Sequence, residues 1–233
     1  MTEPIGPEDS VLTLPTGLPL LLCYITDRSQ FPGSEEQKHA RLLQKISECA
    51  AAGVDYIQLR EKDLSLRELE RLAECAMKAL ASGTSTRLLI NSRVDVALAC
   101  GAHGVHLPAS DISPSEARAL FARAKKLSSA VIGASCHSAE EASLAEAHGA
   151  DFALFGPVFE KNRQANPHGE KSLRAVCHRP GMARIPMPVL ALGGIDLRNA
   201  ERCIRAGASG IAGIRLFQQN ATEEIVKKLR ALS

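Results

Sequence analysis

Three polar residues that alternate along one apolar segment could bind an anion. Gln58, Arg60 and Lys62 occupy every second position, so their side chains share one side of the predicted strand. An arginine and a lysine placed together suit a phosphate or a carboxylate. The alternative is an internal salt bridge, in which Glu61 or Asp63 neutralises these cations. The spacing alone leaves both interpretations open.

Glycines near the end of the chain form a second candidate anion site. Gly193 and Gly194 follow one predicted strand, and Gly213, Ile214 and Arg215 follow the next. Glycine lets a backbone approach a ligand closely, and the helix that follows offers free N–H groups to a phosphate. In an α/β barrel, the loops after the seventh and eighth strands are the usual phosphate site.

His137 is the candidate general acid and base. It follows a predicted strand, and Ser138 with Glu141 predicts a capping box that holds His137 just before a helix. A structural, hydrogen-bonding histidine is the alternative. Cys136 points to the opposite face of the extended segment, which favours a packed cysteine over a Cys–His dyad. His106 is expected to pack inside the barrel.

Further polar residues end other predicted strands. Asn91 and Ser135 are expected to contact a substrate. Asp111 could bind Mg²⁺, but a single carboxylate makes a poor protein site for this ion. Capping of a helix that begins near Ser113 is an equally good explanation for Asp111.

A glycine repeat indicates which elements position these residues. Ala-Gly-Val-Asp and three similar motifs place their glycines at Gly53, Gly101, Gly149 and Gly207. The first three glycines are 48 residues apart, and the fourth follows 58 residues later. Each lies after an apolar helical stretch, as a glycine that ends a helix should. This spacing equals two strand–helix units and predicts eight units. Strands are predicted at 20–26, 54–59, 87–91, 104–107, 130–134, 151–155, 187–192 and 210–214. Helices are predicted at 35–51, 66–81, 113–126 and 139–148, among others. We therefore expect a single-domain (β/α)8 TIM barrel of class α/β, with a doubly wound open sheet as the alternative.

Composition restricts the class of protein. Hydrophobic residues make up 45% of the chain and the formal net charge is +2, which predicts no nucleic-acid or membrane partner. The longest apolar run, 18–25, is too short to span a bilayer. We expect 1–17 to be a flexible tail that lacks the features of a signal peptide, and 18–233 to form the barrel. Seven cysteines without a C-x-x-C pair predict reduced thiols and a cytoplasmic protein.

The strand ends together resemble a known family. Across residues 20 to 218 the chain is similar to the thiamine phosphate synthase/TenI superfamily, through Tyr24-x-Thr26-Asp27, Gln58-Leu59-Arg60-Glu61-Lys62, Asn91-x-Arg93-Val94-Asp95, Gly104-Val105-His106-Leu107, Ser135-x-His137-Ser138 and Leu192-Gly193-Gly194-Ile195. The resemblance implies a (β/α)8 barrel whose ligands are the pyrimidine and thiazole phosphates of thiamine biosynthesis.

Departures from the synthase pattern lead us to expect the other activity of this family. Synthases use Mg²⁺ and carry Asn-Asp-Arg after the third strand, two acidic groups after the fourth, and a Pro-Thr-x-Thr-Lys loop after the sixth. Here Ser92 replaces the first carboxylate, and Asp111 alone remains after the fourth strand. The segment 160–164 lacks both threonines and the lysine that ends the motif. TenI-type thiazole tautomerases aromatise a thiazole carboxylate phosphate by moving a proton, and they need no metal. The resemblance to that branch implies a tautomerase with His137 as acid and base and no cofactor.

Two alternatives to the tautomerase stay open. One is a divergent thiamine phosphate synthase that uses Mg²⁺ at Asp111. The other is a non-catalytic regulatory protein that binds a phosphate ligand. In each case the expected partner is a small-molecule thiazole or pyrimidine phosphate, and a homo-oligomer is compatible with the sequence.

Overall fold

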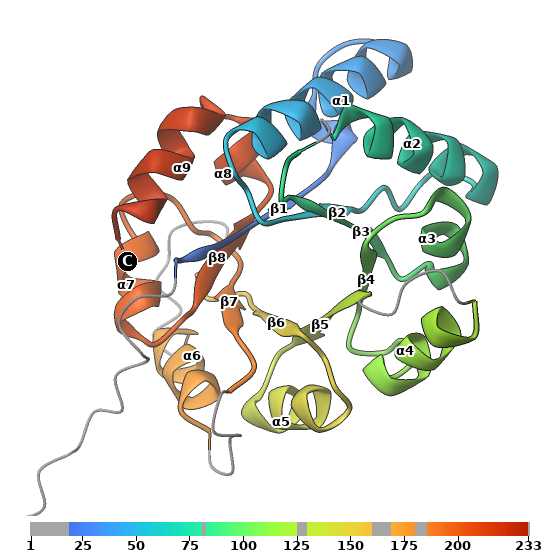
Figure 1. Ribbon diagram of the computed structural model, residues 1–233. Helices are drawn as coiled ribbons and strands as arrows, with labels where there is room; N and C mark the ends of the chain where they lie inside the picture. Colours follow the sequence, from blue (N-terminus) through green and yellow to red (C-terminus); the bar gives the residue numbers. More distant parts are fainter. Residues whose placement is uncertain (1–18, 81–82, 125–129, 160–168, 180–185, 233) are drawn as a thin grey trace, which may run out of the picture.

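Eight parallel strands close into a barrel in chain order (Figure 1). The computed structural model describes residues 19–80, 83–124, 130–159, 169–179 and 186–232. The predicted tail at 1–17 lies outside the described residues. Strand β1 pairs with β8 as well as with β2, for example Leu21 with Gly210 and Cys23 with Tyr56. The closed pairing confirms the (β/α)8 barrel and excludes the open sheet.

The strands coincide with the predicted segments to within one or two residues. The strands are β1 (Leu21–Ile25), β2 (Tyr56–Leu59), β3 (Arg87–Asn91), β4 (Gly104–Leu107), β5 (Val131–Cys136), β6 (Phe152–Phe155), β7 (Val189–Ala191) and β8 (Gly210–Gly213). The bounds of β3 and β4 are the predicted ones.

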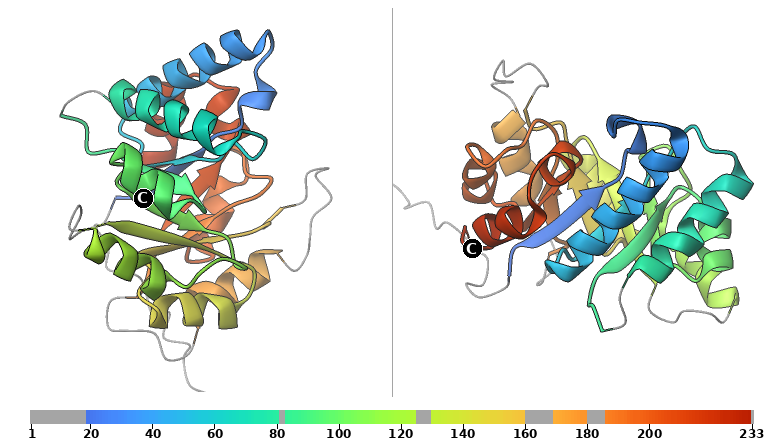
Figure 2. Two further views of the ribbon diagram at one scale, coloured as in Figure 1. Left: turned by 90° about the vertical axis from the view of Figure 1, so that its right-hand side faces the viewer. Right: turned by 90° about the horizontal axis from the view of Figure 1, so that it is seen from above.

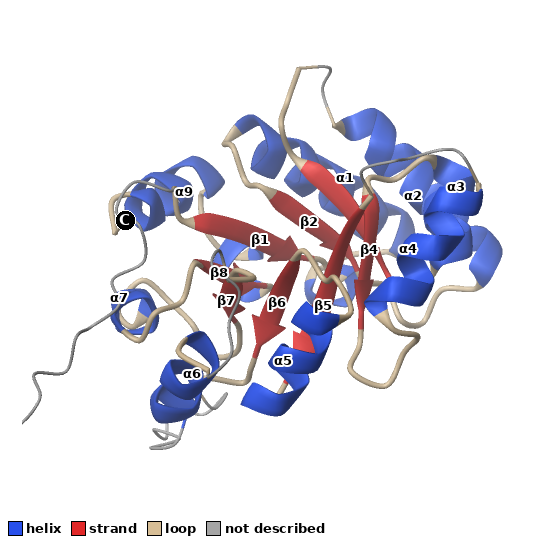
Figure 3. Ribbon diagram, turned by 60° about the horizontal axis from the view of Figure 1, so that its bottom comes forward, coloured by secondary structure: helices blue, strands red, loops and turns tan. Residues whose placement is uncertain are grey.

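Helices cover the outside of the barrel (Figures 2 and 3). In chain order they are η1 (Arg28–Gln30), α1 (Glu35–Ala51), α2 (Leu66–Ala79), α3 (Val94–Cys100), α4 (Pro114–Arg123), α5 (Ala139–Ala147), α6 (Gly169–Cys177), α7 (Ala200–Arg205), α8 (Arg215–Gln218) and α9 (Thr222–Arg230). Ser34, Ser65 and Ser113 each form a complete capping box, which accounts for the sharp starts of α1, α2 and α4.

Two apolar clusters lie on the two sides of the strands. The larger one packs the outer strand faces against the helices and includes Ile57, Leu88 and Val105. The smaller one fills the barrel interior; Leu89, Phe152 and Leu190 belong to it. Side chains therefore alternate between the two clusters along each strand, as the period of two requires.

The repeated glycines end the odd-numbered helices, as predicted. All four adopt the left-handed conformation that glycine tolerates, with φ of 81°, 71°, 79° and 102° at Gly53, Gly101, Gly149 and Gly207. In the first three repeats, the residue two positions after the glycine accepts a hydrogen bond from a backbone N–H of the preceding strand. The donor is the second residue of that strand. These bonds join Leu22 N to Asp55 (2.7 Å), Leu88 N to His103 Nδ1 (3.0 Å) and Ile132 N to Asp151 (2.7 Å). The repeat thus ties successive strands together at the amino-terminal end of the barrel.

The cysteines match the prediction of reduced thiols. All seven cysteines are free thiols, and Cys23, Cys49, Cys136 and Cys203 are buried, whereas Cys75 is exposed. Within the described ranges, no helix is long and apolar enough to cross a membrane.

Candidate active site

Polar side chains fill the carboxyl end of the barrel interior on four adjacent strands. Gln58 on β2, Asn91 on β3, His106 on β4 and Ser135 on β5 follow the apolar interior residues. The register pairs Asn91 with His106, so two of these residues lie side by side. Below them, Tyr56 stacks on Phe152 with ring centroids 4.6 Å apart. One half of the barrel mouth is therefore polar, and aromatic side chains lie beneath it in the barrel interior.

Two hydrogen bonds connect these four residues in pairs. The Gln58 amide Nε2 donates to Asn91 Oδ1 at 2.8 Å, and His106 Nε2 lies 2.9 Å from Ser135 Oγ. Gln58 and His106 are buried, whereas Asn91 and Ser135 are half-buried. In each pair, a buried residue (Gln58 or His106) thus bonds to a half-buried residue (Asn91 or Ser135) that lies at the mouth. His106 lies inside the barrel as predicted, but the sequence interpretation missed its bond to Ser135.

Arg60 and Lys62 continue the side of β2 that carries Gln58. The Arg60 backbone N–H donates to Thr26 Oγ1 at 2.9 Å, which holds the end of β2 against β1. Arg60 is half-buried and Lys62 is exposed. Among the described residues, no hydrogen bond or ion pair involves either side-chain cation. The charge of Arg60 reaches the Asp27 carboxylate, but no described side chain bonds to Arg60 or Lys62, so both can bind an anion at the mouth.

The proposed internal salt bridge exists, but with a different arginine. Arg28 is buried and donates to both oxygens of Asp63, at 2.6 and 2.7 Å, and to Glu61 at 3.2 Å. Burial raises the pKa of Glu61, while hydrogen bonds from Thr26 and Arg28 oppose that shift. The hydrogen bond from Arg28 lowers the pKa of Asp63. Because Arg28 satisfies both carboxylates, they do not neutralise Arg60. The salt-bridge alternative for the cation cluster is wrong.

The two glycines after β7 lie against the segment that follows β6. Gly193 and Gly194 have φ of 99° and 62°, and a Cβ atom on them would lie 2.7 Å from Pro157 Cα and 2.6 Å from the Phe159 carbonyl oxygen. Backbone bonds from Val158 N to Leu192 O and from Phe159 N to Gly193 O hold the two segments together. The glycines thus allow a close approach of protein backbone at the mouth.

The second part of the predicted phosphate site follows β8. Gly213 ends this strand, Ile214 precedes α8, and Arg215 begins that helix as an exposed residue. The first turn of any helix leaves N–H groups without intrahelical partners. Since β7 and β8 are paired neighbours, the two glycine-containing turns emerge at the same edge of the barrel.

His137 lies at the rim with its imidazole exposed. Its Nδ1 atom is 2.7 Å from the Gly156 carbonyl oxygen, across the gap between β5 and β6. Ser138 caps α5 by accepting from Glu141 N at 3.1 Å, but the Glu141 carboxylate accepts from His137 N at 2.7 Å and not from Ser138 N. Only half of the predicted capping box forms. Cys136 is buried, and burial raises its pKa to about 12, which confirms a packed thiol.

Ser92 and Asp111 meet where a metal would be expected. Ser92 has φ of 66°, and its hydroxyl contacts the Asp111 carboxylate. Asp111 also accepts from Ile112 N at 2.8 Å, while Ser113 caps α4 without help from Asp111, so the capping explanation for Asp111 is wrong. In the part of the chain that the structure describes, no group of three or more acidic, histidine or cysteine side chains could hold a metal ion.

The comparisons assign the family. A barrel whose mouth combines uncommitted cations with hydrogen-bond donors suits an enzyme that acts on phosphorylated small molecules. The chain belongs to the TMP-TENI family, described as thiamine monophosphate synthase, whose model matches residues 22–217. It is thus a member of an enzyme family of thiamine biosynthesis.

Named relatives favour one activity within that family. The chain is 37% identical to the thiamine-phosphate synthase of Chlorobium luteolum, over 91% of this chain and 92% of that protein. It is 40% identical to the thiamine-phosphate synthase of Halalkalibacterium halodurans, over 77% and 82% respectively. The structure of a thiamine phosphate pyrophosphorylase from Pyrococcus furiosus matches with a TM-score of 0.72 at 29% identity, over 91% of this chain and 95% of that one. The expected assignment to the tautomerase branch is therefore wrong.

Proposed function

We propose that this protein is a thiamine-phosphate synthase, which joins a pyrimidine diphosphate to a thiazole phosphate and releases pyrophosphate. The names of its relatives support this activity. The structural observation that carries the proposal is the pair of uncommitted cations, Arg60 and Lys62, at the carboxyl end of β2. Arg28 bonds to the neighbouring Glu61 and Asp63, so these two acidic groups do not occupy Arg60 and Lys62.

The proposed reaction places the chemical demand on the diphosphate. A carbon–nitrogen bond forms between the pyrimidine methylene and the thiazole nitrogen, and the carbon–oxygen bond to the diphosphate breaks. The diphosphate leaves with the electron pair, so negative charge grows on its oxygens. Arg60 and Lys62 would stabilise this charge, and the Asn91 amide and the Ser135 hydroxyl would add hydrogen bonds.

The same chemistry changes the role of His137. The thiazole nitrogen carries no hydrogen before it attacks, so joining the two rings requires no general base. Two observations agree with a rim position for His137: its ring is exposed, and its Nδ1 atom is within hydrogen-bond distance of the Gly156 carbonyl oxygen. We therefore assign His137 to the rim of the site, without a proton-transfer step.

The thiazole phosphate would occupy the opposite edge of the mouth. Gly193 and Gly194 after β7 and the turn at Gly213–Arg215 after β8 are the candidate phosphate contacts. A phosphate at this edge and a diphosphate bound across the residues of β2 to β5 would place the two substrates on opposite sides of the barrel axis. This arrangement leaves the centre of the mouth for the two reacting atoms.

The family uses Mg²⁺, and the donor set here fits this ion only with help from the substrate. Asp111 supplies one carboxylate and Ser92 one hydroxyl. Mg²⁺ commonly uses one or two carboxylates together with substrate phosphates and water. Asp111, with Ser92 beside it, would therefore hold the ion together with the diphosphate. When bound, the ion would neutralise part of the charge of the leaving group.

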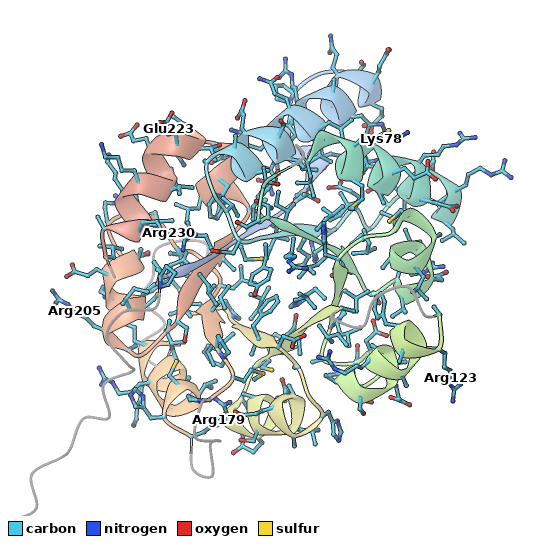
Figure 4. The ribbon with its side chains drawn as sticks, viewed as in Figure 1. Lys78, Arg123, Arg179, Arg205, Glu223 and Arg230 are labelled. Carbon is cyan, nitrogen blue, oxygen red and sulfur yellow. The ribbon has the colours of Figure 1, made fainter. Side chains whose placement is uncertain are left out.

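A direct assay tests the proposed function. Purified protein is mixed with both substrates and Mg²⁺, and thiamine phosphate and pyrophosphate are measured. We expect equal amounts of the two products. Arg60→Ala should lower kcat/KM by about 10- to 150-fold, since a charge-assisted contact contributes about 1.5–3 kcal/mol. Arg123→Ala is the matched control, because Arg123 is exposed at the end of α4 and points outward (Figure 4).

Other outcomes would identify other functions. Binding of both ligands without product would favour the non-catalytic phosphate-binding protein. If Arg60→Ala and Arg123→Ala are equally active, the cation cluster does not contribute to the reaction, even if the wild-type protein forms product.

A further inference from the structure

Two buried donors lie beneath two polar residues of the mouth. Gln58 is 3% exposed and His106 is 1% exposed, and each is bonded to a half-buried residue on the neighbouring strand. Asn91 receives the bond from Gln58, and Ser135 is the partner of His106. The arrangement repeats on two pairs of adjacent strands, β2 with β3 and β4 with β5.

Each buried residue also keeps one polar atom without a partner among the described residues. These atoms are Gln58 Oε1 and His106 Nδ1. The Nδ1 edge of the His106 ring lies against Gly133, where a Cβ atom would be only 2.6 Å away. The imidazole therefore fills the space that the glycine leaves free. A polar partner for Nδ1 has no room on this side.

The unpartnered Nδ1 atom determines which ring nitrogen of His106 carries the hydrogen. A buried N–H without an acceptor is rarer and more costly than a buried acceptor without a donor. The neutral ring therefore favours hydrogen on Nε2, which then donates to Ser135 Oγ. A charged ring would bury an Nδ1–H group without an acceptor among the described residues, so the 1% exposed ring is neutral.

The bond from His106 decides what Ser135 can offer to a ligand. A hydroxyl has one hydrogen to donate. If Ser135 Oγ accepts from His106, its own hydrogen stays available for the mouth. In the same way, Asn91 Oδ1 accepts from Gln58, which leaves the Asn91 amide N–H groups for the mouth. Both outer residues thus present donors beside Arg60 and Lys62.

We propose that His106 is a positioning residue that fixes the Ser135 hydroxyl as a hydrogen-bond donor to the diphosphate. Gln58 performs the equivalent role for Asn91. This polar half of the mouth then presents donors and cations, and it selects a highly charged anion. The inference rests on the proposed synthase function, because that function supplies the diphosphate.

A spectroscopic measurement tests the tautomer without altering the site. The chain has seven histidines, and the ¹⁵N signals of His106 are those that disappear in His106→Gln. We expect the ligand-free protein to show a neutral His106 ring protonated at Nε2. A ring protonated at Nδ1 would overturn the inference even if the protein is an active synthase.

A double-mutant cycle tests whether His106 acts through Ser135. The probe is inorganic pyrophosphate, and its Kd is measured by calorimetry. We expect Ser135→Ala and His106→Met each to weaken binding about 10-fold, and the double variant to be no weaker than Ser135→Ala alone. His106→Gln keeps an N–H donor and should retain most of the affinity. Leu154→Val is the control, since Leu154 is the register partner of Ser135 but lies in the apolar interior cluster.

The outcomes separate this inference from the proposed function. Independent, multiplicative losses in the double variant would show a merely structural role for His106 and overturn the inference. A wild-type protein that binds no pyrophosphate would overturn both the proposed function and the donor role of Ser135. The melting temperature of each variant shows whether it is folded, and the tautomer of the wild-type ring decides the matter if His106→Met does not fold.

Discussion

Replacing Ser92 by aspartate should convert a weak metal site into a strong one. Ser92 already contacts the Asp111 carboxylate, so an aspartate at this position places two carboxylates together. The backbone favours the change, because φ at Ser92 is 66° and aspartate tolerates this left-handed conformation better than most residues. The cost of the substitution is therefore electrostatic.

The magnitude of that cost follows from the distance and the environment. Two carboxylates about 4 Å apart repel each other by about 1 kcal/mol in water and about 4 kcal/mol at the effective dielectric constant of a protein surface. Both positions are half-buried, so we expect a value between these limits. In a chain of this size, each kcal/mol lowers Tm by about 2–4 °C. Ser92→Asp should therefore lower Tm by roughly 5–10 °C without metal.

Thermal unfolding with and without Mg²⁺ checks this reasoning. Millimolar Mg²⁺ should restore most of the lost Tm in Ser92→Asp, because the ion removes the repulsion between the carboxylates. The wild-type Tm should change by less than about 1 °C, since Asp111 is the only carboxylate of the pair. Ser92→Asn is the control for shape and backbone conformation and should not respond to the ion. A wild-type response as large as that of Ser92→Asp would refute the argument.

Three further predictions concern single side chains. In chemical denaturation, Gly194→Ala should destabilise the protein by about 2–4 kcal/mol and Gly101→Ala by about 1 kcal/mol. Both glycines have a left-handed φ, but only a Cβ atom at position 194 would meet the Phe159 carbonyl oxygen. Burial lowers the pKa of His106 to about 3, so the unfolded chain binds one more proton than the folded chain between about pH 3 and 6.5. The free energy of unfolding should therefore rise with pH in this window. His106→Gln should reduce that rise in unfolding curves measured across the same pH range. His137→Gln should keep kcat within about 3-fold in the coupling assay, and a 100-fold loss would restore a proton-transfer role to this residue.

The sequence was sufficient for the barrel because local and global signals agree. The glycine repeat marks helix ends, and the apolar segments between turns match the strands to within two residues. The largest differences occur at β5 and β7. β5 runs on to Cys136, because Ser135 and Cys136 pair with β6 although the apolar pattern ends at Ala134. Backbone pairing extends a strand beyond its hydrophobic pattern, and a single sequence does not display that pairing.

Contacts between distant residues explain what the sequence interpretation missed in the site. Arg28 lies 33 positions before Glu61, and no local spacing links it to the acidic residues beside Arg60. The bond from His106 to Ser135 joins residues on neighbouring strands. Only the register of β4 against β5 brings them together. Polar residues at strand ends could be predicted, but not which of them satisfy one another.

The choice between two activities of one family depended on how much a single lost carboxylate matters. Ser92 argues against Mg²⁺ only if the protein alone must hold the ion. A diphosphate brings its own oxygen ligands, so one carboxylate at Asp111 can be enough when the substrate is present. The cations Arg60 and Lys62 suit either activity, because a thiazole carboxylate phosphate also carries a second anionic group, and it is the named relatives that favour the synthase. The loss of one ligand that the substrate can replace is therefore weak evidence against a metal-dependent reaction.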